Sequence, residues 1–320
     1  MSRWFQVIPL DRAVAQLAAG TLPTRAAAIT FDDGYADNAT AALPVLKKHG
    51  MTATFFVASA FLDGGRMRND SVIEAVRSYS GRVIDLREIG LGAHSLESDA
   101  QRGAAVNSLL GQIKYLDPLK RQEAVLAIET LAGSLLPDDL MMTSDQVRHL
   151  HREGMQIGAH TCSHPILANL SDEDARHKMR SGKIALEAVI ADSVTLFAYP
   201  NGRPKKDYLA KHAEMAKQLG FSAAVTTAPG VSTANTDLFQ MPRFSPGDKI
   251  PCVTESGCCR TYDLPRRKRR EKRLSSLAAL DQLAGQVRKI SQERSRVSHR
   301  SDVVADLWPE KIRKEPRDLW

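Results

Sequence analysis

The chain has 320 residues, 43% of them hydrophobic, which is enough to bury a core as one large domain with an appendage or as two domains. Its formal net charge of +7 comes from the C-terminal part: residues 249–320 contain 18 Lys and Arg against 10 Asp and Glu, whereas residues 1–248 contain 26 against 27. An argument from net charge for polyanion binding therefore applies only to the C-terminal part, and no segment is long and apolar enough to span a membrane.

Residues 1–9 do not show a charged leader followed by an apolar core and a cleavage site, which predicts a cytoplasmic location. Cys252, Cys258 and Cys259 lie in the basic C-terminal part, and only Cys162 lies in the body. A body with one cysteine cannot form an internal disulfide, which agrees with a reducing compartment.

Strand-like and helix-like segments alternate along the body. Short apolar or β-branched runs predict strands at residues 26–31, 52–59, 155–160, 194–199 and 221–227. Helical apolar spacing, a capping box at Thr143–Gln146, an N-cap at Ser171 and glycine stops predict helices at residues 38–49, 143–153, 172–191 and 204–219. This order predicts an α/β fold with a mostly parallel sheet, open or closed into a barrel.

Residues 61–142 interrupt this alternation. Segments 71–79, 104–116 and 119–131 look helical, which predicts a helical insertion or cap near the functional site. Asn69 and Asp70 open the first of these helices, where helix capping and substrate contact are both open interpretations.

Residues 249–320 do not continue the strand and helix pattern, and we expect weak or local order there. Their basic run, residues 266–273, has three interpretations: a nucleic-acid or anionic-surface contact, a solvated tail, or a non-native C-terminus that follows a shift of reading frame. No aromatic residues interleave the run, so base stacking is disfavoured. We therefore predict one domain over residues 1–248, followed by a basic tail.

Asp32 and Asp33 come directly after the first predicted strand. The carboxyl ends of parallel strands form the edge where active sites of α/β folds collect, and Gly34 allows close approach of the backbone to a ligand. A solvated Asp-Asp-Gly turn is the alternative interpretation.

His160 and His164 follow the strand predicted at residues 155–160. Four residues apart on a helical turn, both rings would face one side and could share a metal, although a pair of polar loop histidines is also possible. One Asp and two His suit Zn²⁺ or a similar divalent ion and leave positions free for water and substrate. The remaining Asp could then accept a proton from that water, which outlines a metal-assisted hydrolase.

A third strand end is closed by the turn Tyr199-Pro-Asn-Gly202. The turn is either a simple connection or a place where the exposed Asn201 N–H stabilises a developing oxyanion. Cys162 lies two residues from each histidine, so it should point away from their shared face and pack rather than bind metal.

In this order, Thr30-Phe-Asp-Asp-Gly34, His160-Thr-Cys-Ser-His164 and the Tyr-Pro-Asn-Gly turn resemble the motifs of the polysaccharide deacetylase family, the NodB-homology domain of carbohydrate esterase family 4. The longer strings from Ala28 to Asn38, Ala53-Thr-Phe-Phe-Val57 and Ile157-Gly-Ala-His160 strengthen the resemblance, which extends over about residues 25–246.

The resemblance implies a distorted (β/α) barrel with fewer units than the TIM form. It also implies that Asp33, His160 and His164 bind a divalent metal, commonly Zn²⁺ with Co²⁺ or a similar ion as the alternative, and that Asp32 is the catalytic base. The implied activity is metal-dependent N-deacetylation of a polysaccharide or oligosaccharide with release of acetate.

Two features of the family pattern are absent. The turn usually begins with Arg and has Tyr before its Gly, where this chain has Ala198 and Asn201. The late Leu-x-His that often supplies the general acid is also missing, which leaves the acid unassigned. Arg243, on a late strand, could replace the missing charge partner of Asp32 or could be a surface residue.

Two other functions therefore remain open at the level of sequence. One is a metal-dependent hydrolase acting on a small acetamide or cyclic imide, and the other is a non-catalytic relative that binds glycan. A partner other than the glycan substrate is predicted only for the basic tail.

Overall fold

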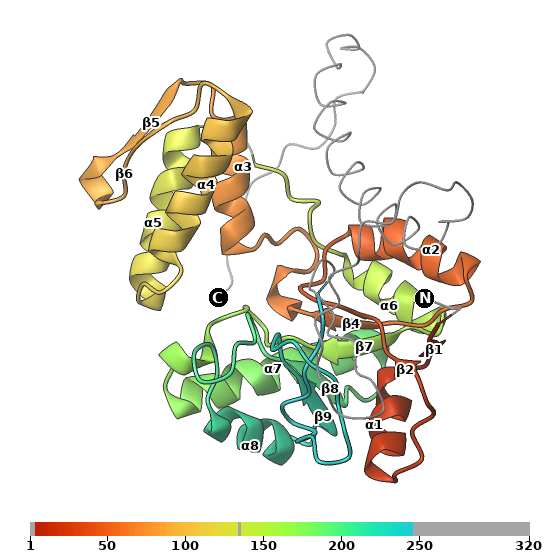
Figure 1. The fold of residues 1–320 in the computed structure, drawn as a ribbon. Helices are drawn as coiled ribbons and strands as arrows, with labels where there is room; N and C mark the ends of the chain where they lie inside the picture. The colour runs from red at the N-terminus through yellow and green to blue at the C-terminus, as the bar shows by residue number, and fades with distance from the viewer. Residues whose placement is uncertain (1–3, 134–135, 246–320) are drawn as a thin grey trace, which may run out of the picture. The chain divides into compact units, whose positions relative to one another are not determined.

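A computed structural model describes residues 4–133 and 136–245, all of which belong to one compact unit (Figure 1). The predictions for the tail at residues 249–320, including its basic run at residues 266–273, lie outside the described residues. None of the helices in the described part of the chain is both long and apolar enough to cross a membrane.

Five parallel strands form the central sheet in the order β3-β4-β7-β8-β9. Their bounds are Thr30–Phe31, Thr54–Val57, Gln156–Ala159, Leu196–Ala198 and Ala223–Val225. Each strand begins or ends within a few residues of the run that predicts it, and the expected parallel α/β sheet is confirmed. Because every strand runs in the same direction, all their carboxyl ends lie at one edge of the sheet.

The apolar run at residues 26–31 is split into two strands. Its first part, β2 (Ala26–Ala27), pairs in parallel with β1 (Gln6–Val7), whereas β3 pairs with β4. The chain therefore changes its pairing partner in the middle of the run, which sequence periodicity cannot reveal.

The sheet is curled. Arg243 Nε donates to the carbonyl of Thr226, just after β9, and Arg243 Nη1 donates to Thr30 Oγ1 in β3. Because β3 and β9 are the two edge strands of the sheet, one side chain can contact both only if the edges bend toward each other.

Side chains alternate between two apolar clusters on the two faces of the sheet. Phe55 and Phe197 join the cluster beneath the surrounding helices, and their neighbours Phe56 and Leu196 join a second cluster on the other face. All four side chains are buried, and loss of a buried aromatic ring such as Phe55 would cost about 3–5 kcal/mol.

Helices surround the sheet (Figure 1). They are α1 (Leu10–Ala18), a π-helical turn (Asn38–Ala42) leading into α2 (Leu43–Lys48), α6 (Ser144–Arg152), α7 (Asp172–Ile190) and α8 (Ala210–Gln218). The capping box at Thr143 and the N-cap at Ser171 are confirmed: each hydroxyl accepts a backbone N–H three residues later. The helix α1 was not predicted.

The helix predicted to begin at Pro204 begins instead at Ala210, so that prediction was wrong at its start. Lys205 has a left-handed φ of 63°, which breaks a helix at that point. The buried Asp207 accepts hydrogen bonds from the backbone and guanidinium of Arg203, which fixes this segment as a turn.

The segment between β4 and α6 forms a helical unit with its own buried cluster. Its elements are α3 (Arg68–Ser78), α4 (Asp99–Ile113), α5 (Pro118–Ala132) and an antiparallel hairpin of β5 (Val83–Leu86) and β6 (Gly92–Ser95), packed side by side in Figure 1. Short 3₁₀ turns lie at Ser59–Phe61, Arg87–Ile89 and Leu167–Asn169. The three helices match the predicted ones, and the hairpin was not foreseen.

Candidate metal centre and active site

The end of β3 turns sharply at Asp33. This residue has a left-handed φ of 75°, which Asp tolerates better than most residues, and Gly34 follows at 92°. A Cβ on Gly34 would lie 2.9 Å from Val57 Cγ1, so only glycine fits against the next strand. The turn therefore presents the Asp32 and Asp33 carboxylates at the carboxyl edge of the sheet.

The histidine pair lies on the loop after β7. Thr161 and His164 both have left-handed φ values, 62° and 51°, so the loop is an irregular turn and not the helical turn suggested by the spacing. The His164 N–H donates to Thr161 Oγ1 at 3.0 Å. The Cys162 carbonyl accepts from the Ala60 N–H, and the Cys162 N–H donates to the Lys178 carbonyl. These contacts fix the conformation of the loop. Although the turn is not helical, the His160 and His164 rings both lie close to Asp33.

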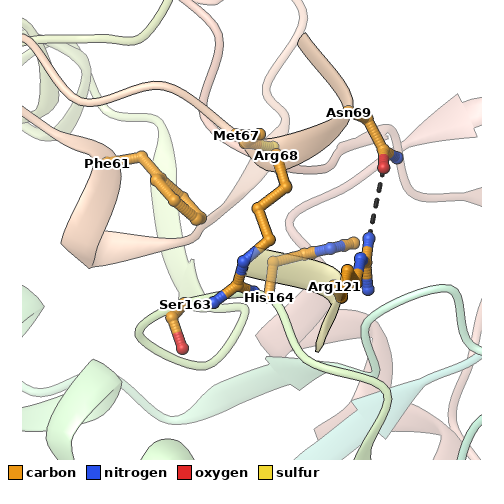
Figure 2. A pocket seen from close by; sticks show the side chains of 7 residues that line it. All are labelled: Phe61, Met67, Arg68, Asn69, Arg121, Ser163 and His164. Atoms are coloured by element: carbon orange, nitrogen blue, oxygen red, sulfur yellow. Dashed lines mark hydrogen bonds between the residues drawn. The ribbon is translucent and has the colours of Figure 1, made fainter. Parts of the chain in front are cut away.

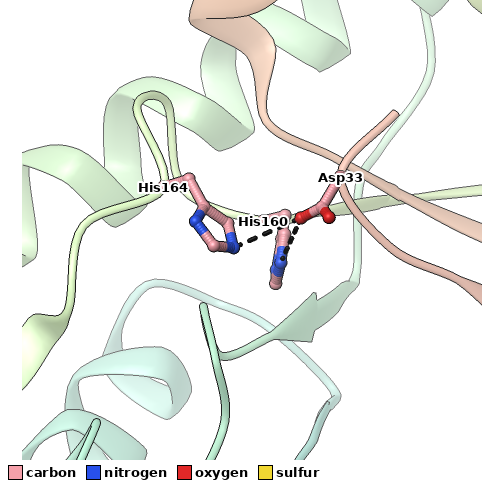
Figure 3. A group of neighbouring side chains, drawn as sticks. All are labelled: Asp33, His160 and His164. Atoms are coloured by element: carbon pink, nitrogen blue, oxygen red, sulfur yellow. Dashed lines mark ion pairs between the residues drawn. The ribbon is translucent and has the colours of Figure 1, made fainter. Parts of the chain in front are cut away.

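The side chains of Asp33, His160 and His164 converge (Figure 3). Asp33 Oδ1 lies 3.3 Å from His160 Nε2 and 3.2 Å from His164 Nε2. One potential ligand atom from each residue lies within 4.8 Å of the other two. The structure thus brings together the three residues that the sequence nominates as a metal-binding set.

A backbone carbonyl fixes the orientation of His160. His160 Nδ1 lies 2.8 Å from the carbonyl oxygen of Ala198, which can only accept, so Nδ1 carries the proton. Nε2, the other ring nitrogen, faces Asp33 and is therefore the one available to a metal. A carbonyl that orients the distal nitrogen is the usual support for a histidine that binds metal.

Burial and charge set the protonation of this cluster. Burial, followed by the neighbouring His160, lowers the pKa of His164 to about 4, so its ring is neutral at pH 7. Burial opposes the charged form of His160, but its hydrogen bond with Asp33 and the charges of Asp32 and Asp33 raise the pKa of His160 above its usual value. A divalent cation fits this donor set, because it would replace the proton that His160 and Asp33 hold between them.

Asp32 is held by Arg243. Arg243 Nη1 and Nη2 lie 2.8 Å from Asp32 Oδ1 and Oδ2, respectively, a two-point contact between guanidinium and carboxylate. Burial pushes the pKa of Asp32 upward, but the Arg243 hydrogen bonds and the charges of His160 and Arg243 outweigh it and lower that pKa. Asp32 is therefore ionised and oriented beside the Asp33–histidine cluster.

Asn201 follows β8 in a left-handed conformation with φ of 60°. Its carbonyl accepts from Thr227 Oγ1 at 2.7 Å, whereas its N–H has no hydrogen-bond partner among the described residues. No hydrogen bond joins Asn201 to the metal-binding set. Cys162 is a free thiol and is not one of the three converging side chains.

Asp70 does not cap the insertion helix, so the capping interpretation was wrong. The helix starts at Arg68 with Met67 as its N-cap residue, and Asp70 is buried with Oδ1 accepting from Tyr35 Oη at 3.1 Å. Asn69 accepts from Arg121 Nη2 at 3.2 Å.

Sequence reasoning missed the positions of Arg68 and Arg121. Both arginines line a hollow that also includes His164. Each lies among polar residues near the start of a helix of the insertion, and no local pattern distinguishes it from a solvated residue.

Comparison with known proteins identifies the family of this chain. The model of the family described as "Polysaccharide deacetylase" matches residues 19–97 and 113–224. YxkH of Bacillus subtilis (strain 168) is 23% identical over 221 residues, 68% of this chain and 51% of that protein. The chain therefore spans about half the length of this curated relative.

Solved structures of low sequence identity are also similar. The deacetylase PplD of Streptococcus pyogenes, solved in complex with acetate, is 19% identical with a TM-score of 0.49, over 76% of this chain and 74% of that one. The deacetylase domain of BpsB from Bordetella bronchiseptica is 17% identical with a TM-score of 0.47, over 76% and 79% of the two chains. The family assignment depends on the family model, which covers more than half of the residues: the chain belongs to the polysaccharide deacetylase family.

Proposed function

We propose that this chain is a metal-dependent hydrolase that removes N-acetyl groups from a polysaccharide or oligosaccharide and releases acetate. The observation that carries the proposal is the convergence of Asp33, His160 and His164, with the ionised Asp32 beside them, in a member of this family. The proposed metal is Zn²⁺, with Co²⁺ or a similar ion as the alternative.

Asp33, His160 and His164 would hold the cation. When bound there, a divalent ion would polarise the acetamide carbonyl and make a water molecule more acidic. The Asp33 side chain is 28% exposed and that of His160 only 2%, so solvent and substrate would reach the centre from the Asp33 side.

Asp32 is the proposed general base. The water oxygen forms a bond to the acetamide carbon, and Asp32 accepts the proton that this water loses. Arg243 keeps Asp32 ionised and holds its orientation. The free N–H of Asn201 is the proposed donor to the oxyanion that develops on the carbonyl.

The C–N bond then breaks, acetate leaves, and the departing sugar nitrogen takes up a proton. Among the described residues no histidine is assigned as the acid, because His160 and His164 are the proposed ligands and no other histidine belongs to the convergent set. Asp32 can pass the proton that it has accepted to the departing amine. Its proposed role is therefore that of base first and acid second.

Acetate release from N-acetylglucosamine oligomers tests this proposal. The full chain is treated with a chelator, reloaded with Zn²⁺ or Co²⁺, and compared with Asp32→Asn and with Asp145→Asn, an exposed aspartate of α6. We expect release to require the metal, to fall by at least about a hundredfold in D32N, and to be unchanged in D145N. Release that survives chelation would contradict the mechanism, and binding of the oligomer without turnover would favour a non-catalytic glycan-binding protein.

A further inference from the structure

A small hollow that is partly open to solvent lies beside His164. Its lining includes Arg68 from α3, Arg121 from α5, and Asn69 and Ser163 (Figure 2). Figure 2 shows the Arg68 side chain extending from its helix toward Ser163 and His164. We call this space the arginine hollow. It adjoins the proposed metal centre, because His164 belongs to both.

Within the described residues, no carboxylate pairs with either arginine of the hollow. Half-buried Arg68 forms no hydrogen bond or ion pair with any residue of the described ranges. Arg121 donates from Nη2 only to the uncharged amide oxygen of Asn69, and its Nε is buried without a partner. By contrast, Arg66 of the same insertion pairs with Glu129 at 2.9 Å.

Two partly buried like charges side by side are unfavourable without a counter-charge. Burial lowers the pKa of Arg121, and the nearby Arg68 lowers it further. Buried charges in proteins are normally paired, and a buried donor left unsatisfied costs free energy. An anion in the hollow would remove both penalties, since a guanidinium fork matches a carboxylate or a phosphate group.

A second hollow continues from the first. It shares Arg68 and Arg121 and adds Lys114 and Asn169, and apolar side chains complete its lining: Leu116, Pro165, Ile166 and Leu170. No Asp or Glu lines either hollow within the described part of the chain. The two hollows together form a cationic path that leads away from His164, which suits a chain with negative charges more than a neutral one.

We propose that Arg68 and Arg121 bind an oxyanion, a carboxylate or a phosphate ester, on the sugar next to the acetamido sugar, so that the substrate is an acidic glycan. This inference rests on the proposed function, because the adjoining centre determines which sugar is placed over it. The insertion then selects the substrate, while the residues of the sheet edge carry out the chemistry.

Direct binding tests the charge preference without turnover. Isothermal titration of the full chain uses an oligomer of alternating N-acetylglucosamine and glucuronic acid, the methyl ester of that oligomer, and a 6-phosphorylated N-acetylglucosamine oligomer. We expect at least one of the charged forms to bind about tenfold or more tightly than the neutral ester, as charge-assisted hydrogen bonds to arginine would give. The charged oligomer that binds more tightly shows whether the hollow prefers a carboxylate or a phosphate ester.

Variants assign that preference to the hollow. Arg68→Gln removes a side chain without internal partners, so it should fold as the parent does, and it should lose most of the preference for the charged form. Arg121→Gln should act in the same direction. Arg77→Gln is the matched control, because Arg77 lies on the same helix but pairs with Glu74.

Equal affinity for the charged and neutral forms, or a preference that survives in R68Q and R121Q, would overturn the inference. These outcomes are separate from the proposed function, which is tested by metal-dependent release of acetate from any N-acetylated oligomer. A protein that deacetylates the neutral and charged oligomers equally well would keep the function and refute the acidic substrate.

Discussion

Arg243 and Asp32 are 211 positions apart in the sequence and meet through two contacts of 2.8 Å. Arg243 also contacts Thr226 after β9 and Thr30 in β3, so it links the two edges of the sheet at the active site. The same side chain therefore closes the curled sheet and orients the proposed base.

The first prediction concerns this ion pair. Arg243→Ala should lower kcat/KM by about 10–100-fold, because Asp32 loses the partner that orients it and keeps it ionised. Metal content should not change, since Arg243 contacts none of the three proposed ligands. Added guanidinium should restore part of the activity, which a purely structural role would not allow.

The matched control for Arg243 is Arg87→Ala, which removes an exposed ion pair with Asp85 in the insertion. Its activity should equal that of the parent. Full activity in R243A would show that Asp32 needs no such partner.

The second prediction concerns the metal. Zn²⁺ or Co²⁺ should raise the melting temperature of metal-free protein, because an ion that binds only the folded state stabilises it, by about 2.7 kcal/mol at a hundred times Kd. His164→Ala and Asp33→Ala should abolish this shift.

Thermal scans with and without Zn²⁺ measure the effect, with metal analysis as a second readout. His151→Ala is the control, because His151 lies on α6 beside Asp192 and outside the convergent set. If Zn²⁺ raises the melting temperature of H164A as much as that of the parent, the metal binds at another site.

The third prediction concerns Asp70. Burial first, and then the nearby charges of Asp33 and Glu74, raise the pKa of Asp70 to about 6 although its hydrogen bond from Tyr35 acts in the opposite direction. The folded state therefore holds the proton more tightly than the unfolded state does, and stability is lost as pH rises through about 6. Asp70→Asn should stabilise the protein by about 2 kcal/mol above pH 6, and the gain should vanish near pH 4.

Chemical denaturation of D70N and its parent across this pH range measures the difference. Asp63→Asn provides a control of opposite sign, because hydrogen bonds from Ser144 lower the pKa of Asp63 and its stabilisation is present only at higher pH. A pH-independent difference between D70N and the parent would show that Asp70 is not the titrating group.

The fourth prediction compares two helical glycines. A Cβ on Gly182 of α7 would lie 2.5 Å from the carbonyl carbon of Thr161, within the loop that carries both histidines. Gly182→Ala should destabilise the protein by about 1–3 kcal/mol and weaken metal binding, because the loop must shift.

Gly103 of α4 has open space around it, so Gly103→Ala should stabilise the protein by about 0.5–1 kcal/mol through helix propensity alone. Denaturation and zinc titration of both variants measure the contrast. If G182A behaves like G103A, the loop does not depend on its contact with α7.

Local patterns predicted the elements that carry the site. The strands before Asp33 and His160 are short apolar runs, and their polar residues come directly at the strand ends. The capping signals at Thr143 and Ser171 were equally local, because each cap joins residues three positions apart. The sequence thus contained the proposed ligands and their place at one edge of the sheet.

Elements that depend on distant partners could not be predicted in this way. The helix α1 has no side-chain cap, and its first N–H, that of Leu10, donates to Gln156 Oε1 at 2.8 Å, a residue of β7. The late start of α8 depends on the buried contact between Arg203 and Asp207.

The amino-acid sequence by itself determined the alternation of strands and helices, the family and the nomination of Asp33, His160 and His164, because these depend on neighbours within a few residues. Tertiary structure alone decided that Arg243 holds Asp32 and that Arg68 and Arg121 lie beside His164. The physical reason is that charge pairing and burial depend on distance in space, which for these residues is set only when the sheet curls and the insertion packs.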